Sequence, residues 1–131
     1  MVKISKTDDE WKLLLTEEEF QITRKSKTEL AFSGKLLNNK EIGVYNCICC
    51  NEELFDSSVK YESGCGWPSF FKPSKTNNVG SKKDHSFFME RTEVHCKKCD
   101  AHLGHVFEDG PRDKGGLRYC INSVALNFKK K

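Results

Sequence analysis

Seven of the 131 residues are cysteines, and four of these stand in two Cys-x-x-Cys pairs. The pairs are Cys47 with Cys50 and Cys96 with Cys99. A tight turn directs both sulfurs of such a pair to one side, and four thiolates form the closed tetrahedral set that structural Zn²⁺ prefers. Since 45 residues separate the pairs, against roughly 15–20 in a simple zinc ribbon, we expect one structural zinc ion that joins two distant segments.

Other uses of these cysteines stay open. The pairs could be two redox dithiols or buried thiols without a metal, although the βαβ pattern of thioredoxin-like proteins does not accompany them. Cys49 could replace a neighbour in the first pair, but a Cys47/Cys49 pair is too closely spaced for the usual turn. His102 and His105 could also bind the metal, although four thiolates already complete its shell.

Two further cysteines lie in segments suited to redox catalysis. Cys65 stands between two glycines, which leave its backbone mobile and its thiol accessible. Cys120, if it lies in a strand, shares one face with Arg118 and Asn122 because side chains alternate along a strand. A neighbouring cation stabilises the thiolate, the nucleophilic form of cysteine. An inert buried cysteine is the ordinary alternative, and the flanking Arg118 and Asn122 favour a reactive one.

A run with two histidines supplies candidate proton donors. As a strand it places His105, Phe107 and Asp109 on one face. His102 has the opposite parity unless Gly104 marks a bulge, which is a common use of glycine in strands. Imidazoles near a nucleophilic thiol serve naturally as general acids.

The elements that position these residues are predicted to be two short helices followed by β structure. Thr7 with Glu10 and Thr16 with Glu19 fit capping boxes, and apolar residues follow each cap at helical spacing. After about Glu29, turn residues separate short apolar or alternating runs, which favours an antiparallel β core over βαβ units. The predicted strands cover residues 30–32, 42–45, 86–95, 101–107 and 118–128.

Three polar segments are predicted to lie outside these strands. Asn38-Asn39 is typical of a hairpin turn between two of them. Residues 72–85 are rich in Lys, Asn and Ser and are expected to form an exposed loop. Residues 129–131, all lysine, are expected to form a solvated basic tail.

The composition excludes several classes of protein. The net charge of +3 is mild, so we expect no nucleic-acid partner. The longest apolar runs have four or five residues, far below the roughly 20 of a membrane helix, so we expect no membrane association. No apolar run follows Met1 to Lys6, which argues against a secretory signal and favours a cytoplasmic location. The length predicts one domain, residues 1–131.

Three blocks of the sequence resemble the methionine-R-sulfoxide reductase family (MsrB). The blocks are Ser63-Gly64-Cys65-Gly66-Trp67-Pro68-Ser69-Phe70, Ala101-His102-Leu103-Gly104-His105-Val106-Phe107 with Asp109-Gly110-Pro111, and Gly116-Leu117-Arg118-Tyr119-Cys120-Ile121-Asn122-Ser123. The two Cys-x-x-Cys pairs match the zinc-containing branch of that family. The likeness covers residues 7–128, and the doubled glycine at 115–116 is a small loop variation.

This resemblance implies a mainly β fold of two twisted antiparallel sheets, with short N-terminal helices and a structural zinc site. It also implies reduction of methionine-R-sulfoxide, in oxidised proteins or as the free amino acid, by a monomer that thioredoxin recycles. The residues that it assigns to the substrate pocket are Trp67, His102, His105, Phe107, Asp109, Arg118 and Asn122.

The resemblance also assigns roles to the two redox cysteines. Cys120 is the nucleophile that attacks the sulfoxide sulfur, and His105, supported by His102 and Asp109, gives a proton to the oxygen. Cys120 becomes a sulfenic acid, which Cys65 converts to a disulfide. The competing function is a zinc-ribbon binding module for RNA or protein, which would explain the cysteine pairs and the lysine tail but neither the Cys120 segment nor the histidines. For Trp67 the competing role is core packing.

Overall fold

The computed structural model describes residues 3–75, 77–85 and 89–131. Its first elements are two short helices, α1 (Asp8–Leu14) and α2 (Glu17–Arg24). Both begin at the predicted capping boxes, since Thr7 and Thr16 each exchange hydrogen bonds with the glutamate three residues further on. The prediction of two N-terminal helices is confirmed. Neither of these helices, the only α-helices in the described part of the chain, has the length and apolar character needed to cross a bilayer.

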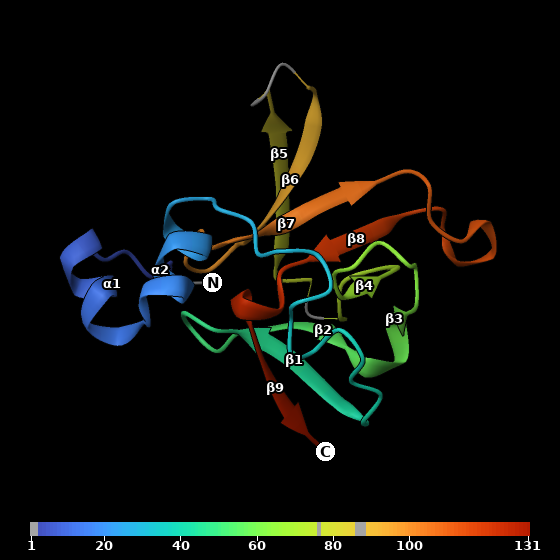
Figure 1. Cartoon of the computed structure of the whole chain (residues 1–131), viewed down its shortest axis with the longest axis horizontal. Coiled ribbons are helices and arrows are strands. Elements are labelled where there is room, and N and C mark those ends of the chain that lie inside the picture. The colour runs from blue at the N-terminus through green and yellow to red at the C-terminus, as the bar shows by residue number, and fades with distance from the viewer. Residues whose placement is uncertain (1–2, 76, 86–88) are drawn as a thin grey trace.

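The rest of the fold consists of two antiparallel sheets (Figure 1). The smaller sheet has the strand order β2-β1-β9, and the larger has the order β3-β4-β8-β7-β6-β5. This arrangement confirms the mainly β fold. The strands are β1 (Gly43–Cys47), β2 (Glu53–Asp56), β3 (Lys60–Tyr61), β4 (Ser69–Phe70), β5 (Val79–Asp84), β6 (Arg91–Cys96), β7 (His102–Phe107), β8 (Arg118–Ile121) and β9 (Leu126–Lys130), and the 3₁₀ turns are η1 (Ser57–Val59), η3 (Arg112–Lys114) and η4 (Ser123–Ala125).

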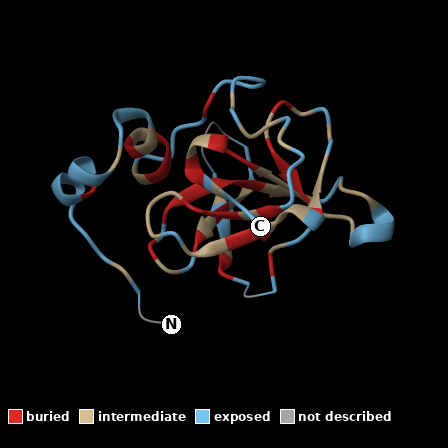
Figure 2. Ribbon diagram, turned by 90° about the horizontal axis from the view of Figure 1, so that it is seen from below, coloured by how far each residue is buried: buried red, intermediate tan, exposed pale blue. Residues whose placement is uncertain are grey.

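Aromatic side chains join the two sheets into one core. Tyr45 of β1 and Phe55 of β2 both pack on Phe70 of β4, with ring centroids 5.1 and 4.3 Å away. All three rings are fully buried. Aromatic pairs at this spacing contribute about 0.5–1.5 kcal/mol beyond the burial of their surface. Burial is concentrated in the strands, whereas the helices at one side expose much of their surface (Figure 2).

The helices are attached to the sheets through Trp11 and Phe20, both almost fully buried. The Arg24 guanidinium lies 4.5 Å from the centre of the Trp11 ring and donates a hydrogen bond of 2.7 Å to the carbonyl oxygen of Cys99. The end of α2 therefore contacts the second Cys-x-x-Cys turn directly.

The prediction of a loop over residues 72–85 is wrong in its second half. Residues 79–84 form β5, which pairs with β6 along its whole length. β5 is an edge strand of the larger sheet, and three of its six residues are exposed. Lysine is a frequent residue on edge strands because it prevents pairing with other chains. The composition of β5 therefore resembles that of a loop.

Four smaller predictions are also corrected. Lys129 and Lys130 pair with β1 as part of β9, so the basic tail is reduced to Lys131. Residues 30–32 lie in a turn and not in a strand, and Asn38-Asn39 therefore does not connect a hairpin. Of the predicted strand 86–95, residues 91–95 belong to β6, whereas residues 86–88, like Met1 and Val2, lie outside the described residues.

Candidate active site and metal centre

The strand register places a thiol and an imidazole side by side. Cys120 on β8 pairs directly with His105 on β7 and with Ser69 on β4. His105 in turn pairs with Glu93 on β6. Directly paired residues present their side chains to the same face, with Cβ atoms about 4.5–5.5 Å apart. One row across the larger sheet therefore carries a hydroxyl, a thiol, an imidazole and a carboxylate.

The two cysteines that lie outside the Cys-x-x-Cys pairs and their turns meet at this row. The Sγ atoms of Cys65 and Cys120 are 3.3 Å apart. Burial raises the pKa of the Cys65 thiol, but hydrogen bonds led by those from Ser63 and Ser69 outweigh it and lower this pKa to about 7. Burial, together with the hydrogen bond and the negative charge of Cys65, raises the pKa of Cys120 to about 12. Cys65 is therefore the member of the pair that ionises first, and Cys120 keeps its proton.

Both thiols line a pocket of about 190 Å³. Trp67 and Phe107 supply aromatic surface to it, and the indole N–H of Trp67 donates a 3.0 Å hydrogen bond to the backbone carbonyl of Glu29. This bond fixes the ring at the pocket and not inside the core. The sequence-predicted residues that line the pocket are Cys65, Trp67, His105, Phe107, Arg118, Cys120 and Asn122.

His105 is held by a carboxylate that the sequence prediction did not include. Its Nε2 lies 2.8 Å from Oδ2 of Asp84, and the guanidinium of Arg91 lies 3.4 Å from the same oxygen. Burial lowers the pKa of His105, and the hydrogen bond with Asp84 opposes this shift. The charge of Arg91 lowers it further. The carboxylate and the guanidinium therefore act on the imidazole in opposite directions.

His102 lies behind His105, with ring centroids 5.6 Å apart. The register between β6 and β7 shifts so that β7 gains one residue between His102 and Gly104, which brings both imidazoles to one side as the bulge hypothesis required. Nδ1 of His102 lies 3.5 Å from a carboxylate oxygen of Glu93, and His102 lowers the pKa of that carboxyl. Gly104 has its own constraint: a Cβ there would meet the backbone carbonyl of Cys120.

Arg118 and Asp109 form a bidentate pair at the mouth of the pocket. The guanidinium donates hydrogen bonds of 2.9 and 3.2 Å to the two oxygens of Asp109 and lies 4.5 Å from the centre of the Phe107 ring. Arg118 holds the pKa of the exposed Asp109 carboxyl below its usual value, and Asp109 raises the pKa of Arg118. Asp109 thus orients Arg118, whereas Asp84 contacts His105.

Asn122 lines the pocket, but its amide binds backbone. Its Oδ1 accepts a hydrogen bond from the N–H of Glu29, and its Nδ2 donates one to the carbonyl oxygen of Leu103, each at 3.0 Å. The carboxylate of Glu29 also accepts a bond from the N–H of Val124. Asn122 therefore ties the segment that holds Trp67 to the strand that carries the histidines.

The four cysteines of the two pairs come together at the opposite end of the β6–β7 hairpin. Their Sγ atoms all lie within 4.8 Å of one another, and Cys47–Cys99 and Cys50–Cys96 are each 3.6 Å apart. Cys47, Cys96 and Cys99 are buried. A tetrahedral zinc ion with four sulfurs at 2.3 Å spaces them by roughly 3.8 Å, so this donor set fits the metal closely. Neither Cys49 nor a histidine belongs to the group found among the described residues.

Several residues of the site were missed from the sequence, among them Ser63, Ser69, Asp84, Arg91 and Glu93. Both serines flank Cys65, and their spacing gave no sign that they reach its sulfur. Asp84 and Glu93 come from β5 and β6, and their role depends on the register of the larger sheet. The one available signal was that Arg91 and Glu93 stand two residues apart in the predicted strand 86–95, which places both charges on one face.

The sequence was compared with known proteins. The family model described as the SelR domain matches residues 15–130. The chain is 58% identical to the peptide methionine sulfoxide reductase MsrB of Pseudomonas fluorescens (strain Pf0-1), over 98% of this chain and 97% of that protein. It is 54% identical to the proteins of the same name from Acinetobacter baylyi and Methanosarcina barkeri, over 98% and 96% of this chain and 92% and 88% of those proteins. The chain therefore belongs to the MsrB family of methionine sulfoxide reductases.

Proposed function

We propose that this chain reduces methionine-R-sulfoxide, free or within a polypeptide, to methionine. The observation that supports this most directly is the pair of thiols 3.3 Å apart in an aromatic-walled pocket beside an imidazole. A thiol that attacks a sulfoxide needs a second thiol within bonding reach to remove the oxygen, and a proton donor for that oxygen. Sulfur–aromatic contacts with Trp67 and Phe107, about 0.3–1.5 kcal/mol each, would hold the substrate methylthio group.

In the first step, the sulfur of Cys120 attacks the sulfoxide sulfur. The Cys120 proton passes to the Cys65 thiolate, 3.3 Å away, as the new S–S contact forms. His105 as imidazolium gives a proton to the sulfoxide oxygen. The hydroxyl group then moves from the substrate sulfur to the Cys120 sulfur as the S–S bond breaks, so methionine leaves and Cys120 is oxidised to a sulfenic acid.

In the second step, Cys65 attacks the sulfenic sulfur of Cys120. The Cys65–Cys120 bond forms, the S–O bond breaks, and the oxygen leaves as water with the proton that Cys65 had carried. The sulfenic sulfur is reduced and Cys65 is oxidised, so no further oxidant is needed. An external dithiol, for which we propose thioredoxin, then reduces the disulfide by exchange.

We also propose that Cys47, Cys50, Cys96 and Cys99 bind one structural Zn²⁺. Four thiolates leave no open coordination position, so these cysteines would stabilise the fold and take no part in the reaction. Zinc-bound and catalytic thiols both require a reducing surrounding, which supports a cytoplasmic location. We further propose that the chain acts as a monomer built as the single domain 1–131.

The test is reduction of a peptide that carries defined sulfoxide epimers, with dithiothreitol or thioredoxin as reductant. Cys120→Ser should abolish reduction with either reductant. Cys65→Ser should release one methionine per enzyme and then stop with thioredoxin, because no disulfide forms. Steady turnover by Cys120→Ser would refute its role as nucleophile, and equal turnover of both epimers would refute the R preference. Elemental analysis should find one zinc per chain.

A further inference from the structure

Two serine hydroxyls surround the sulfur of Cys65. The hydroxyl of Ser63 donates a hydrogen bond to Sγ at 3.0 Å, and the hydroxyl of Ser69 lies 3.4 Å from the same atom. The two hydroxyl oxygens are only 2.6 Å apart. The backbone N–H of Cys65 also points to Oγ of Ser63, at 3.3 Å. The sulfur, both hydroxyls and this N–H form one compact hydrogen-bonded group.

The protons of this group favour a charged sulfur. Each hydroxyl has one proton to donate and two lone pairs that accept. When Ser63 donates to Cys65, its oxygen can accept the proton of Ser69. The two hydroxyls then form a chain of hydrogen bonds that ends at the sulfur. Hydrogen bonds in such a chain polarise one another, and they are strongest when the final acceptor is an anion. The proton of Ser69 has an alternative acceptor, the carbonyl oxygen of Trp67 at 3.1 Å, when Cys65 is a neutral thiol.

The fold fixes the Ser69 hydroxyl through strand β4 and folds the Cys65 loop back toward it. Ser69 belongs to β4, is 1% exposed and pairs directly with Cys120. Gly64 and Gly66 on either side of Cys65 have φ values of 79° and 95°, which other residues rarely adopt. These conformations fold the loop back so that the Cys65 sulfur reaches both the serines and Cys120.

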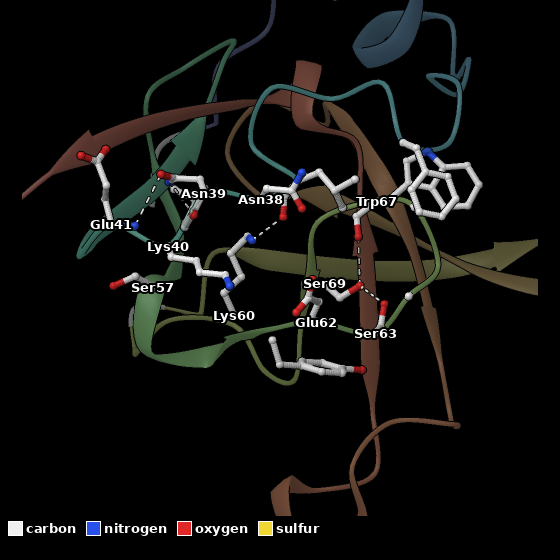
Figure 3. Close-up of a pocket in the computed structure, with 16 residues that line it drawn as sticks. Asn38, Asn39, Lys40, Glu41, Ser57, Lys60, Glu62, Ser63, Trp67 and Ser69 are labelled. Carbon is white, nitrogen blue, oxygen red and sulfur yellow. Dashed lines mark hydrogen bonds between the residues drawn. The ribbon is translucent and has the colours of Figure 1, made fainter.

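The serine pair also borders a second cavity, of about 560 Å³ (Figure 3). Ser63 and Ser69 line this cavity, whereas Cys65 and Cys120 line the substrate pocket. Trp67 lines both, so its loop forms the wall between them. Figure 3 shows the hydrogen bonds that join Trp67, Ser69 and Ser63 along that wall. Ser63, the less buried of the two serines, thus gives the hydroxyl pair a side that faces this cavity and not the substrate pocket.

We propose that Ser63 and Ser69 hold Cys65 as the ionised member of the thiol pair, and that the second cavity gives this hydrogen-bonded group its access to solvent. The proposal rests on the proposed function for the step that it serves. A Cys65 thiolate takes the proton from Cys120 during attack on the sulfoxide, and after losing it again attacks the sulfenic acid. The Cys65–Cys120 bond then forms as hydroxide leaves and becomes water with that proton.

The experiment measures the reaction of Cys65 with a small aromatic disulfide, as a function of pH, in the Cys120→Ser background. Ser63→Ala and Ser69→Ala are compared with Ser57→Ala, which removes another hydroxyl of the same cavity that bonds to the N–H of Gly43. Peptide mass analysis separates Cys65 from the other cysteines. Because this readout needs no sulfoxide, its failure and failure of the proposed reductase activity are separate results.

The parent and Ser57→Ala should react with a midpoint below the ordinary cysteine value of 9.0 and toward the pKa of about 7 to which both hydroxyls contribute. If either serine variant has a pKa of about 8, its thiolate fraction at pH 7 falls about fivefold, whereas its nucleophilicity rises about threefold. It should therefore react about twofold more slowly at pH 7 and about threefold faster above pH 10. Ser63→Thr, which keeps a hydroxyl, should behave like the parent.

This crossing of the two pH profiles distinguishes control of ionisation from structural damage. A loss of rate that is equal at every pH in Ser63→Ala and Ser69→Ala would overturn the proposal, as would an unchanged midpoint. If the alanine variants fail to fold, Ser63→Thr decides: a midpoint near that of the parent supports the proposal, and a midpoint near the ordinary cysteine value of 9.0 refutes it.

Discussion

Replacing Asp84 by asparagine should change the pH dependence of sulfoxide reduction. Asp84 Oδ2 lies 2.8 Å from Nε2 of His105, with 18% of the Asp84 side chain and 11% of the His105 side chain exposed. The amide keeps the size and the hydrogen-bonding capacity of the carboxylate but removes its charge. If His105 is the proton donor, the variant loses the group that stabilises the imidazolium.

The size of the effect follows from the proximity of the two groups. An opposite charge within about 4–6 Å shifts a pKa by about 1–3 units. Burial already lowers the pKa of His105 below its ordinary 6.5, and loss of Asp84 would lower it further. At a pH above both values, the protonated fraction and the rate should therefore fall by about 10- to 1000-fold. At a pH below both values, the rates of variant and parent should converge.

The assay compares kcat/KM of Asp84→Asn and the parent from pH 5 to pH 9. Ionisation of Cys65 affects both enzymes equally, so it cancels in the ratio. Arg91→Gln is the opposing control, because the charge of Arg91 lowers the pKa of His105. Its ratio to the parent should rise with pH, whereas the ratio for Asp84→Asn should fall. Ratios that are independent of pH in both variants would refute the assignment of His105 as the acid.

Two further predictions concern the framework of the site. Cys96→Ser removes one of four thiolates, so it should abolish stoichiometric zinc binding and lower the melting temperature sharply, because structural zinc contributes apparent binding energies of about 10–16 kcal/mol. Elemental analysis and thermal unfolding measure the two effects. Cys49→Ser, measured in parallel, should keep the zinc content and the melting temperature of the parent. Gly104→Ala places a methyl group against the carbonyl of Cys120, so it should cost about 1–3 kcal/mol of stability in denaturant unfolding and, by displacing Cys120, about 100-fold in kcat; an unchanged kcat would show that the two strands separate freely there.

Much of the fold was predictable because its signals are local. The capping boxes at Thr7 and Thr16 predicted both helices, since each box involves residues only three apart. The cluster of four cysteines was predictable because two Cys-x-x-Cys pairs supply the four thiols that a structural zinc site needs. β5 was missed because an edge strand rich in lysine has the composition of a loop, and nothing local indicates that it pairs with β6.

The site was predictable where its residues lie in distinctive runs and hidden where they depend on register. His105 and Cys120 could be named, but their direct pairing could not, because the sequence does not state which position of β7 faces which position of β8. Asp84 could not be identified for the same reason. It lies on the missed strand β5 and reaches His105 of β7 across β6. The polar partners of the imidazole are thus the part of the chemistry that only tertiary structure reveals.

The two groups of cysteines lie on different strands, so they support different parts of the site. The turn with Cys96 and Cys99 connects β6 to β7, the strands that carry Glu93 and His105. Cys65 and Cys120 instead depend on β4 and β8 and on the loop between β3 and β4. A four-thiolate metal centre would therefore fix the position of His105, the proposed proton donor, first and that of the thiols only through the pairing of β7 with β8. Weakening the metal site should impair proton delivery more than closure of the Cys65–Cys120 disulfide, because the disulfide is supported by strands that the metal does not join.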